Sequence, residues 1–464
     1  MDLNLPKPIK RFLMIVALLS FMSQISRAVW AQTYTFQPSD QPLQQSVDVA
    51  ITVEGKVKMK TTRFGVVEEN VKVTGSQSFE QWLGYQRATQ LCRAVRYYHD
   101  LQSKVSIGEG QVKPALRMNR KLIVDQYQFD QHHLYSPQGK LTRDELDLVN
   151  TQLSPTLFYQ LLPQTPVSAG DSWELDSAHL SAILALDAVA QNDVKATLKS
   201  VENGQAVIVC QGEIAGGVNG VLTEVQLTLQ ALYDISSRSF SKVSLDMTER
   251  RGIGHARPGL DVSAKVVVKS TPLNEFIRLN DSIIQKCNRP MTDRDALLSL
   301  VPVADAIELE LSRDWHVMMD QPELLVMRQV IRGDLISQCS LSRLKPLGDN
   351  QRMTVELLKQ QIQKSLGERL AEFTETHQEP LHGKYPHLRV SAVGLVGEVT
   401  FQWVYHHVTD VKGNQYLFVF TIPNDKVSQF GLQDRKVVKS FVFRNELSGK
   451  QPIPASASTD TTKR

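Results

Sequence analysis

The sequence predicts an α+β protein, with a β-rich antiparallel first domain and a second domain that mixes strands with helices. Apolar and polar residues alternate from Thr223 to Tyr233 and from Val243 to Thr248, a period typical of strands with one buried face. Turns such as Asn203-Gly204 and Gly216-Gly217 separate these runs, as in a β-meander. Apolar residues recur every three or four positions from Thr354 to Phe373, which predicts one long helix in the second domain.

Further strands are expected before this meander. Residues Val47 to Val53 alternate in the same way, and Gly55 is expected to turn the chain into a second short strand. The aromatic-rich residues 79–107 fit either a strand or a helix, and periodicity leaves both open. Residues 117–135 predict one or two more strands.

Short helices then follow, with recognisable start signals. Thr142 and Glu145 form a capping-box pattern, in which each side chain satisfies a free backbone N–H of the first turn. Ser154 followed by Pro155 predicts a second helix with serine as its N-cap. A third helical run is expected over residues 178–188.

Two segments of the first domain carry a resemblance. YSPQGKLTRDELDLVN (135–150) and LLPQTPVSAGDSWEL (161–175) resemble a pattern of uncharacterised exported bacterial proteins, in which an LTR-ELDL helix cap precedes LLP, PV, GD and W. The resemblance covers about residues 45–270. It implies one continuous domain, expected over residues 32–271, and brings no activity with it.

A linker with a helical middle is expected over residues 272–305, and the second domain over residues 306–446. Its expected strands are 307–311, 324–331, 335–344, 388–396, 398–408 and 415–422, with the long helix after the third and a last helix from Asp425. Residues 447–464 are too polar to fold and predict a disordered tail.

The second domain resembles the PsbP/Mog1-like fold. The matching residues are Asp314-Trp315, ISQCSLSRLKP (336–346), FQWVYHH (401–407) and YLFVFTI (416–422), together with the amphipathic helix. The resemblance implies an α/β/α sandwich, in which helices cover both faces of an antiparallel sheet. It also implies an accessory or binding role, because most members of that fold lack catalysis.

The N-terminus predicts export. Three basic residues, Lys7, Lys10 and Arg11, precede the apolar run 12–22, and Val29-Trp30-Ala31 offers a cleavage site for a signal peptide at residues 1–31. Arg27 is an awkward neighbour for that site, so an uncleaved anchor is the alternative. The expected location is therefore periplasmic or secreted.

Charge argues against polyanionic partners. The chain has 52 basic and 49 acidic residues, and loss of residues 1–31 removes four basic residues and one acidic residue, leaving 48 of each. A neutral chain has no bulk electrostatic attraction for nucleic acid or an anionic membrane. Because no later run reaches the length of a transmembrane helix, we expect a soluble mature chain.

Four cysteines, Cys92, Cys210, Cys287 and Cys339, allow two disulfides in an exported protein. Cys210 lies within an apolar strand, where a buried free thiol is the commoner state. The sequence leaves the pairing open, and no C-x-x-C spacing predicts a redox or zinc site.

One group of residues suggests a metal site. His377, His382 and His387, with Glu375 and Glu379 among them, could fold around a zinc, copper or nickel ion. Their even spacing of five matches neither a helix turn nor a strand face, so a solvated loop is the competing interpretation. The pair His406-His407 could add one ligand at most, because adjacent strand residues point to opposite faces.

A second group suggests an anion site. Arg250, Arg251, His255 and Arg257 crowd the glycine-containing turn 252–259, where guanidinium groups and turn amides could hold a carboxylate or phosphate. An ordinary solvated hairpin tip is the alternative.

No sequence motif of a known catalytic centre is present, including G-x-S-x-G, H-E-x-x-H, the P-loop and the Rossmann glycines. We therefore expect a non-enzymatic binding or assembly protein of the cell envelope, with no cofactor and with an unidentified protein or small-ligand partner. One alternative is a metal-binding protein or hydrolase that uses the three histidines. Another is a carrier of lipid or a hydrophobic ligand, because a curved sheet can enclose an apolar cavity.

Overall fold

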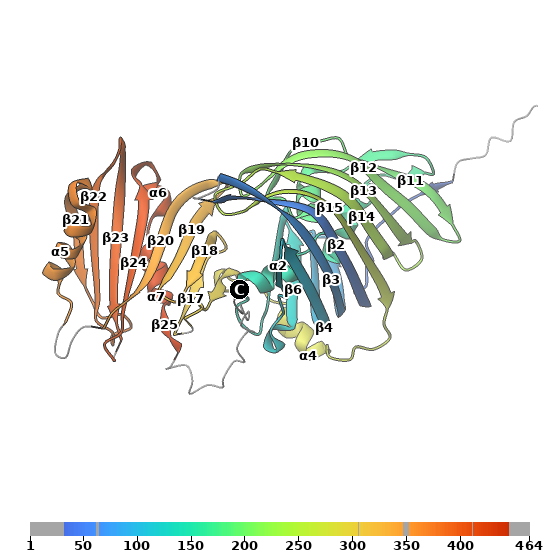
Figure 1. Cartoon of the computed structure of the whole chain (residues 1–464). Helices are drawn as coiled ribbons and strands as arrows, with labels where there is room; N and C mark the ends of the chain where they lie inside the picture. The colour runs from blue at the N-terminus through green and yellow to red at the C-terminus, as the bar shows by residue number, and fades with distance from the viewer. Residues whose placement is uncertain (1–31, 62–64, 305, 347–351, 411, 445–464) are drawn as a thin grey trace, which may run out of the picture.

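The computed structural model describes residues 32–61, 65–304, 306–346, 352–410 and 412–444. The predicted signal peptide and tail lie outside these ranges. Figure 1 shows two sheets side by side, a large curved sheet from the first part of the chain and a smaller one from the second. All strand pairings among the described residues are antiparallel, which confirms the α+β class.

The first domain is built on a 13-stranded sheet in which eleven strands follow the order β7-β6-β4-β3-β2-β15-β14-β13-β12-β11-β9, while β5 pairs with β4 and β10 with β12. Its strands are β2 (Leu43–Thr61), β3 (Gly65–Gln86), β4 (Leu91–Ile107), β5 (Gly110–Val112), β6 (Leu122–Gln128), β7 (Gln131–Tyr135), β9 (Ser172–Glu174), β10 (Ala188–Asn192), β11 (Lys195–Glu202), β12 (Gln205–Val218), β13 (Val221–Asp234), β14 (Ser239–Arg251) and β15 (Gly259–Pro272). A separate pair joins β1 (Thr33–Tyr34) to β8 (Val167–Ser168).

The alternation in the sequence correctly identified the meander β12–β15. The inward side chains of β13 and β14, such as Leu227, Leu229 and Leu245, are buried. The expected turn at Gly55 is wrong, because β2 runs straight through it from Leu43 to Thr61. Gly55 has φ +150°, and a Cβ there would lie 2.2 Å from the carbonyl oxygen of Asp261, so it permits close approach of β15. Residues 79–107, left open above, form the end of β3 and all of β4.

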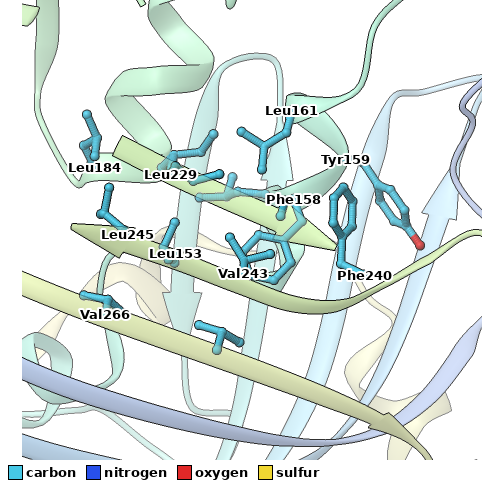
Figure 2. Packing of buried hydrophobic residues seen from close by; sticks show 14 of the residues in the cluster. Leu153, Phe158, Tyr159, Leu161, Leu184, Leu229, Phe240, Val243, Leu245 and Val266 are labelled. Atoms are coloured by element: carbon cyan, nitrogen blue, oxygen red, sulfur yellow. The ribbon is translucent and has the colours of Figure 1, made fainter. Parts of the chain in front are cut away.

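Short helical segments cover the inner face of this sheet. They are α2 (Arg143–Val149), η2 (Pro155–Leu161) and α3 (Ser177–Leu184), whereas the short η1 (Met118–Arg120) has no buried residue. The capping box of α2 is present as predicted, whereas Ser154 does not cap η2, a 3-10 helix. Figure 2 shows Leu153, Phe158 and Leu161 packed against Leu229, Phe240 and Val243 of the sheet. The inner face is thus filled by protein side chains over most of its area.

A buried ionic group fixes η2 to the sheet. The guanidinium of Arg96 on β4 lies 2.7 Å from Asp125 on β6, and both side chains are at most 2% exposed. Arg96 also donates to the hydroxyls of Ser154 (2.8 Å) and Thr156 (2.9 Å), and to Gln81. Ser154 in turn donates to Asp125, which explains why it does not cap the helix. Every polar partner is satisfied, as a buried charge requires.

Residues 272–305, expected to be a linker, pack against the first domain. Their helical middle is α4 (Asp281–Cys287), followed by η3 (Asp293–Ala296). Leu279 and Cys287 are buried beside Val95, Val124 and Tyr135. The carboxylate of Glu80, 1% exposed, accepts hydrogen bonds from the backbone amides of residues 277, 278 and 279. This segment is therefore held by the first domain before the chain enters the second.

The second domain contains a seven-stranded sheet in the order β18-β19-β20-β24-β23-β22-β21. Its strands are β18 (Trp315–Gln321), β19 (Leu324–Ile331), β20 (Asp334–Leu344), β21 (Leu370–Gln378), β22 (His387–Val396), β23 (Val399–Thr409) and β24 (Gln415–Pro423). A small sheet joins β16 (Leu298–Leu300), β17 (Ile307–Leu311) and β25 (Val442–Phe443).

Helices cover both faces of the larger sheet. Leu358 and Ile362 of α5 (Val355–Leu366), which leads into η4 (Gly367–Arg369), pack on Val390 and Trp403. After η5 (Asn424–Lys426), α6 (Val427–Phe430) and α7 (Gln433–Ser440) pack on the other face. The predicted helix end was wrong: Leu370 and Phe373 lie on β21, because Gly367 ends the helix. The two edge strands, β18 and β21, were both missed.

The domains contact each other directly. Lys140 pairs with Glu310 of β17 at 2.6 Å, and Arg313 donates to the carbonyl oxygen of Leu134 on β7. The β12–β13 turn meets the β19–β20 turn so closely that a Cβ on Gly220 would lie 2.1 Å from the Cα of Gly333. Both glycines have positive φ, so this contact depends on their lack of a side chain.

Candidate functional site

One edge of the second-domain sheet carries a run of exposed apolar side chains. Within the described residues, β18 pairs only with β19. Three consecutive side chains of β18, Val317, Met318 and Met319, are each 41–42% exposed. A bulge between Val317 and Met319 interrupts the strand's register and leaves all three accessible. We refer to these three residues as the β18 edge.

The beginning of β18 is held by the first domain. Arg143 of α2 donates hydrogen bonds to the carbonyl oxygens of Arg313 and Trp315, the latter at 3.3 Å. His316 is buried beside this contact, and burial lowers its pKa to about 4, with further lowering by the charges of Arg143 and Arg257. The strand is therefore fixed at its start, and near its end Asp320 accepts hydrogen bonds from the backbone N–H of Val303 at 3.0 and 3.1 Å. The side chains of Val317, Met318 and Met319 lie exposed between these two contacts.

Buried polar groups lie next to the β18 edge, on the inner face of the same strands. Trp315, Gln329 and Ser337 are cross-strand neighbours on β18, β19 and β20, and each is at most 2% exposed. Among the described residues, the indole N–H of Trp315, both amide atoms of Gln329 and the hydroxyl of Ser337 have no hydrogen-bond partner. Buried polar groups without partners are uncommon in folded proteins.

Near the other edge of the same sheet, beside β21, lies a buried network of ion pairs and hydrogen bonds. Asp434 of α7, 1% exposed, accepts hydrogen bonds from Arg389 (2.8 Å) and His406 (3.0 Å). Arg389 also pairs with Glu375, which Arg435 reaches at 3.2 Å. Burial alone would raise the pKa of Asp434, but His406 and Arg389 lower it to about 2. The aspartate is therefore charged and compensated.

Two histidines extend this network. Because a carboxylate only accepts, His406 donates Nε2–H to Asp434, and its Nδ1 lies 2.9 Å from Nε2 of His387. The two rings stack with their centroids 5.2 Å apart. Burial lowers the pKa of His406, and burial followed by the neighbouring His406 lowers that of His387 to about 4. Burial thus disfavours the charged form of both rings.

The three histidines of the predicted metal site occupy three different settings. His377 contacts Glu375 on β21, His382 bonds to the carbonyl oxygen of Phe441 at 3.0 Å, and His387 bonds to His406. Within the described ranges, no group of three or more His, Cys, Asp and Glu side chains has the arrangement of a metal site. His406 and His407 point to opposite sides, as expected, and His407 bonds to Gln415.

Three members of the predicted anion site contact other protein groups in the structure. Arg251, at the end of β14, lies 3.5 Å from Glu249, while Arg257 pairs with Asp147 of α2 at 3.4 Å. The carbonyl oxygen of His255 accepts a hydrogen bond from Arg328 of the second domain. Arg250 lies on the outer side of β14, one residue before Arg251. The turn 252–259 is thus part of the contact between the domains.

Two hollows mark the first domain. An open one of about 800 Å³ lies on the outer face of the sheet and is lined by polar side chains such as Thr52, Gln226 and Thr248. A smaller cavity of about 190 Å³ lies on the inner face and is lined mainly by apolar residues. Pockets for drug-sized ligands usually measure roughly 300–1,000 Å³. The inner cavity is therefore far too small for a lipid.

All four cysteines are free and buried, so the structure contains no bond between the thiols that the sequence left open. Burial raises the pKa of the Cys210 thiol to about 12. Thiols held protonated in this way are poor nucleophiles. Within the described part of the chain, no helix has both the length and the apolar character needed to cross a membrane.

Sequence reasoning missed the β18 edge and the residues that complete the network, Arg389 and Asp434. The run Val317-Met318-Met319 has no alternation, because the bulge exposes all three side chains. Asp434 follows Arg389 by 45 positions, and only the packing of α7 on β22 and β23 joins them. The only signal in the sequence was the position of Asp434 on the face of the last helix that carries its apolar residues.

Comparisons with known proteins identify no family. No family model matches the chain, and no curated protein matches its sequence. Among solved structures, the chain is similar to the cyanobacterial PsbP protein CyanoP of Synechocystis sp. PCC 6803, with 16% identity and a TM-score of 0.26, over 32% of this chain and 92% of CyanoP. It is also similar to lipovitellin, with 9% identity and a TM-score of 0.28, over 52% of this chain and 26% of lipovitellin. At these TM-scores neither likeness carries an argument about function.

Proposed function

We propose that this protein is a non-enzymatic binding or assembly module of the cell envelope, and that it holds an extended segment of a partner protein along the β18 edge. The observation that supports this proposal is the edge strand β18, which pairs with β19 on one side only among the described residues and carries three consecutive exposed apolar side chains. Proteins normally protect such edges with charges, proline or a covering element, because unpaired backbone groups attract other strands.

If a partner segment pairs with β18 as an added strand, it uses both the free backbone groups and the exposed apolar side chains of this edge. The free N–H and C=O groups of β18 would bond to the backbone of an added strand, and Val317, Met318 and Met319 would supply apolar contacts. Methionine suits such a surface because its flexible side chain adapts to different partners. A second copy of this chain is a poorer occupant than a single segment, since Arg143 of the first domain already covers the start of β18.

The location and the fold family belong to the same proposal. The signal-peptide pattern of residues 1–31 supports export to the periplasm or the medium. The order of strands and helices after residue 306, with helices on both faces of the sheet, supports kinship of the second domain with the PsbP/Mog1-like fold. Members of that fold commonly serve as accessory proteins, in keeping with a binding role.

The experiment compares two lysine substitutions at opposite edges of one sheet. The full chain with Met319→Lys places a charge on the β18 edge, and Thr376→Lys places the same charge on β21, where Thr376 is also exposed. Each variant and the wild type are isolated from the native envelope after mild crosslinking. We expect one stoichiometric partner with wild type and Thr376→Lys, at least tenfold depleted with Met319→Lys.

Hydrogen exchange then locates the contact. In the complex, the amides of residues 317–321 should exchange more slowly than in the free chain, while those of β21 should not change. Capture of the same partner by all three chains, or protection elsewhere, would contradict the proposal. Recovery of the wild-type chain alone would also contradict it.

A further inference from the structure

Along β14, the side chains on the inner face of the first-domain sheet change from apolar to charged. Its inward residues Val243, Leu245 and Met247 are apolar, but the next two, Glu249 and Arg251, are charged. Glu249 is only 9% exposed. Burying an ion pair costs desolvation that an apolar pair would avoid. Core packing alone therefore gives no reason for these two residues.

A cavity of about 190 Å³ lies beside this ion pair. It forms because α3 ends at Leu184, and Ala185, with φ 56°, turns the chain away while the sheet continues. Ala264 of β15 then faces the space with only a methyl group, between Val53 of β2 and Met247 of β14. Nine of the twelve lining residues are apolar.

The polar groups of the cavity are Gln152, Glu249 and Arg251. The Nε atom of Arg251 lies 3.5 Å from the Glu249 carboxylate but has no hydrogen-bond partner among the described residues. A buried donor without an acceptor destabilises the folded protein. A bound molecule that accepts a hydrogen bond here would recover this loss.

Size and charge together define what the cavity can hold. An engineered apolar cavity of about 150 Å³ binds benzene, so 190 Å³ admits one ring with a small substituent. The adjacent carboxylate of Glu249 disfavours an anion. A hydroxyl suits both groups, because it accepts from Arg251 and donates to Glu249.

We propose that this cavity is a binding site for a ring-sized apolar molecule that carries one hydroxyl group. The apolar lining holds the ring, and the Glu249–Arg251 pair orients the hydroxyl. This site is separate from the β18 edge and does not depend on it.

The test uses ¹⁹F NMR of the full chain with three fluorinated probes. We expect saturable binding of 4-fluorophenol with a Kd on the order of 1 mM or lower. Fluorobenzene should bind at least several-fold more weakly, and 4-fluorobenzoate should not bind. If 4-fluorophenol shows no saturable binding, or if all three probes bind alike, the proposal is wrong.

Variants place the binding in this cavity. Ala264→Phe fills it and should abolish binding, whereas Ser263→Phe adds the same ring to the outer face of β15 and should retain it. Ala264→Leu serves as a milder filling variant if the phenylalanine disturbs folding, as judged by circular dichroism. Arg251→Met should equalise the affinities of 4-fluorophenol and fluorobenzene. Binding that survives in a folded filling variant would overturn the assignment.

Discussion

The two edges of the second-domain sheet differ in how they meet solvent. At β21, the exposed side chains include Glu372, Thr374 and Thr376, and two bulges interrupt its pairing with β22. At β18, the exposed run is Val317, Met318 and Met319, with one bulge. Polar side chains and bulges are the usual protection against edge-to-edge association. The β21 edge therefore carries this protection, whereas the β18 edge exposes apolar side chains, as the proposed contact requires.

The buried polar groups beside the two edges also differ, in whether they have hydrogen-bond partners. Next to β21, the charges of Arg389 and Asp434 are buried and compensated, and Glu375 ties the edge strand to this network. Next to β18, the polar atoms of Trp315, Gln329 and Ser337 have no partner in the described part of the protein. Ser391 on β22 is an exception on the satisfied side. Stability is thus concentrated at the closed edge, away from the proposed contact.

The largest effect is expected at the closed edge. Asp434→Ala removes the acceptor of Arg389 and His406 and leaves a buried guanidinium without its partner. Breaking a buried pair in this way costs about 3–5 kcal/mol. Urea unfolding, monitored by hydrogen exchange of second-domain amides, should give a free energy of unfolding that is lower than that of the wild type by this amount.

Asp246→Ala is the matched control for that variant. It breaks the exposed pair with Lys265, in which both side chains are about 60% exposed, and should change stability little. Equal small effects of Asp434→Ala and Asp246→Ala would mean that the buried network does not hold the closed edge.

The free energy of unfolding should depend on pH through His316 on β18 and His387 on β22. The pKa of His387 and that of His316 are each lowered to about 4, below the ordinary value of 6.5. The unfolded chain therefore binds more protons between pH 4 and 6.5, so stability is complete above pH 6.5 and is lost as pH falls towards 4. Unfolding free energies measured from pH 4.5 to 7.5 should rise with pH.

Substitution separates the two contributions to this slope. His387→Gln and His316→Gln should each make the slope of unfolding free energy against pH shallower. The first removes a histidine beside His406, and the second removes the histidine at the contact between the domains. A slope unchanged in both variants would assign the pH dependence to other groups, such as His133, whose pKa burial also lowers.

The sequence predicted the meander and the inner strands of the second sheet because their alternation reflects local burial. It failed at the edges, where burial depends on what lies beside a strand. Phe373 continues the helical spacing of α5 but lies on β21, since Gly367 ends the helix. The histidines looked like one cluster in sequence, whereas His387 bonds to His406 on β23, 19 positions further on, and His406 bonds to Asp434 on α7, a further 28 positions along. Such contacts are set by topology, which spacing does not encode.

The smallest effect is expected beneath the open edge, from Gln329→Leu. Gln329 is fully buried, and neither of its amide atoms has a hydrogen-bond partner among the described residues. Replacing it with an apolar residue of similar size removes the desolvation cost of the amide, so the free energy of unfolding should stay level or rise by about 1 kcal/mol.

Ser337→Ala, at the neighbouring position on β20, should behave in the same way for the same reason. Denaturation of both variants beside wild type measures the difference. A loss above about 1 kcal/mol in Gln329→Leu would mean that the amide is hydrogen-bonded in solution. The two sides of the sheet would then be equally satisfied inside, and only their exposed side chains would distinguish the open edge from the closed one.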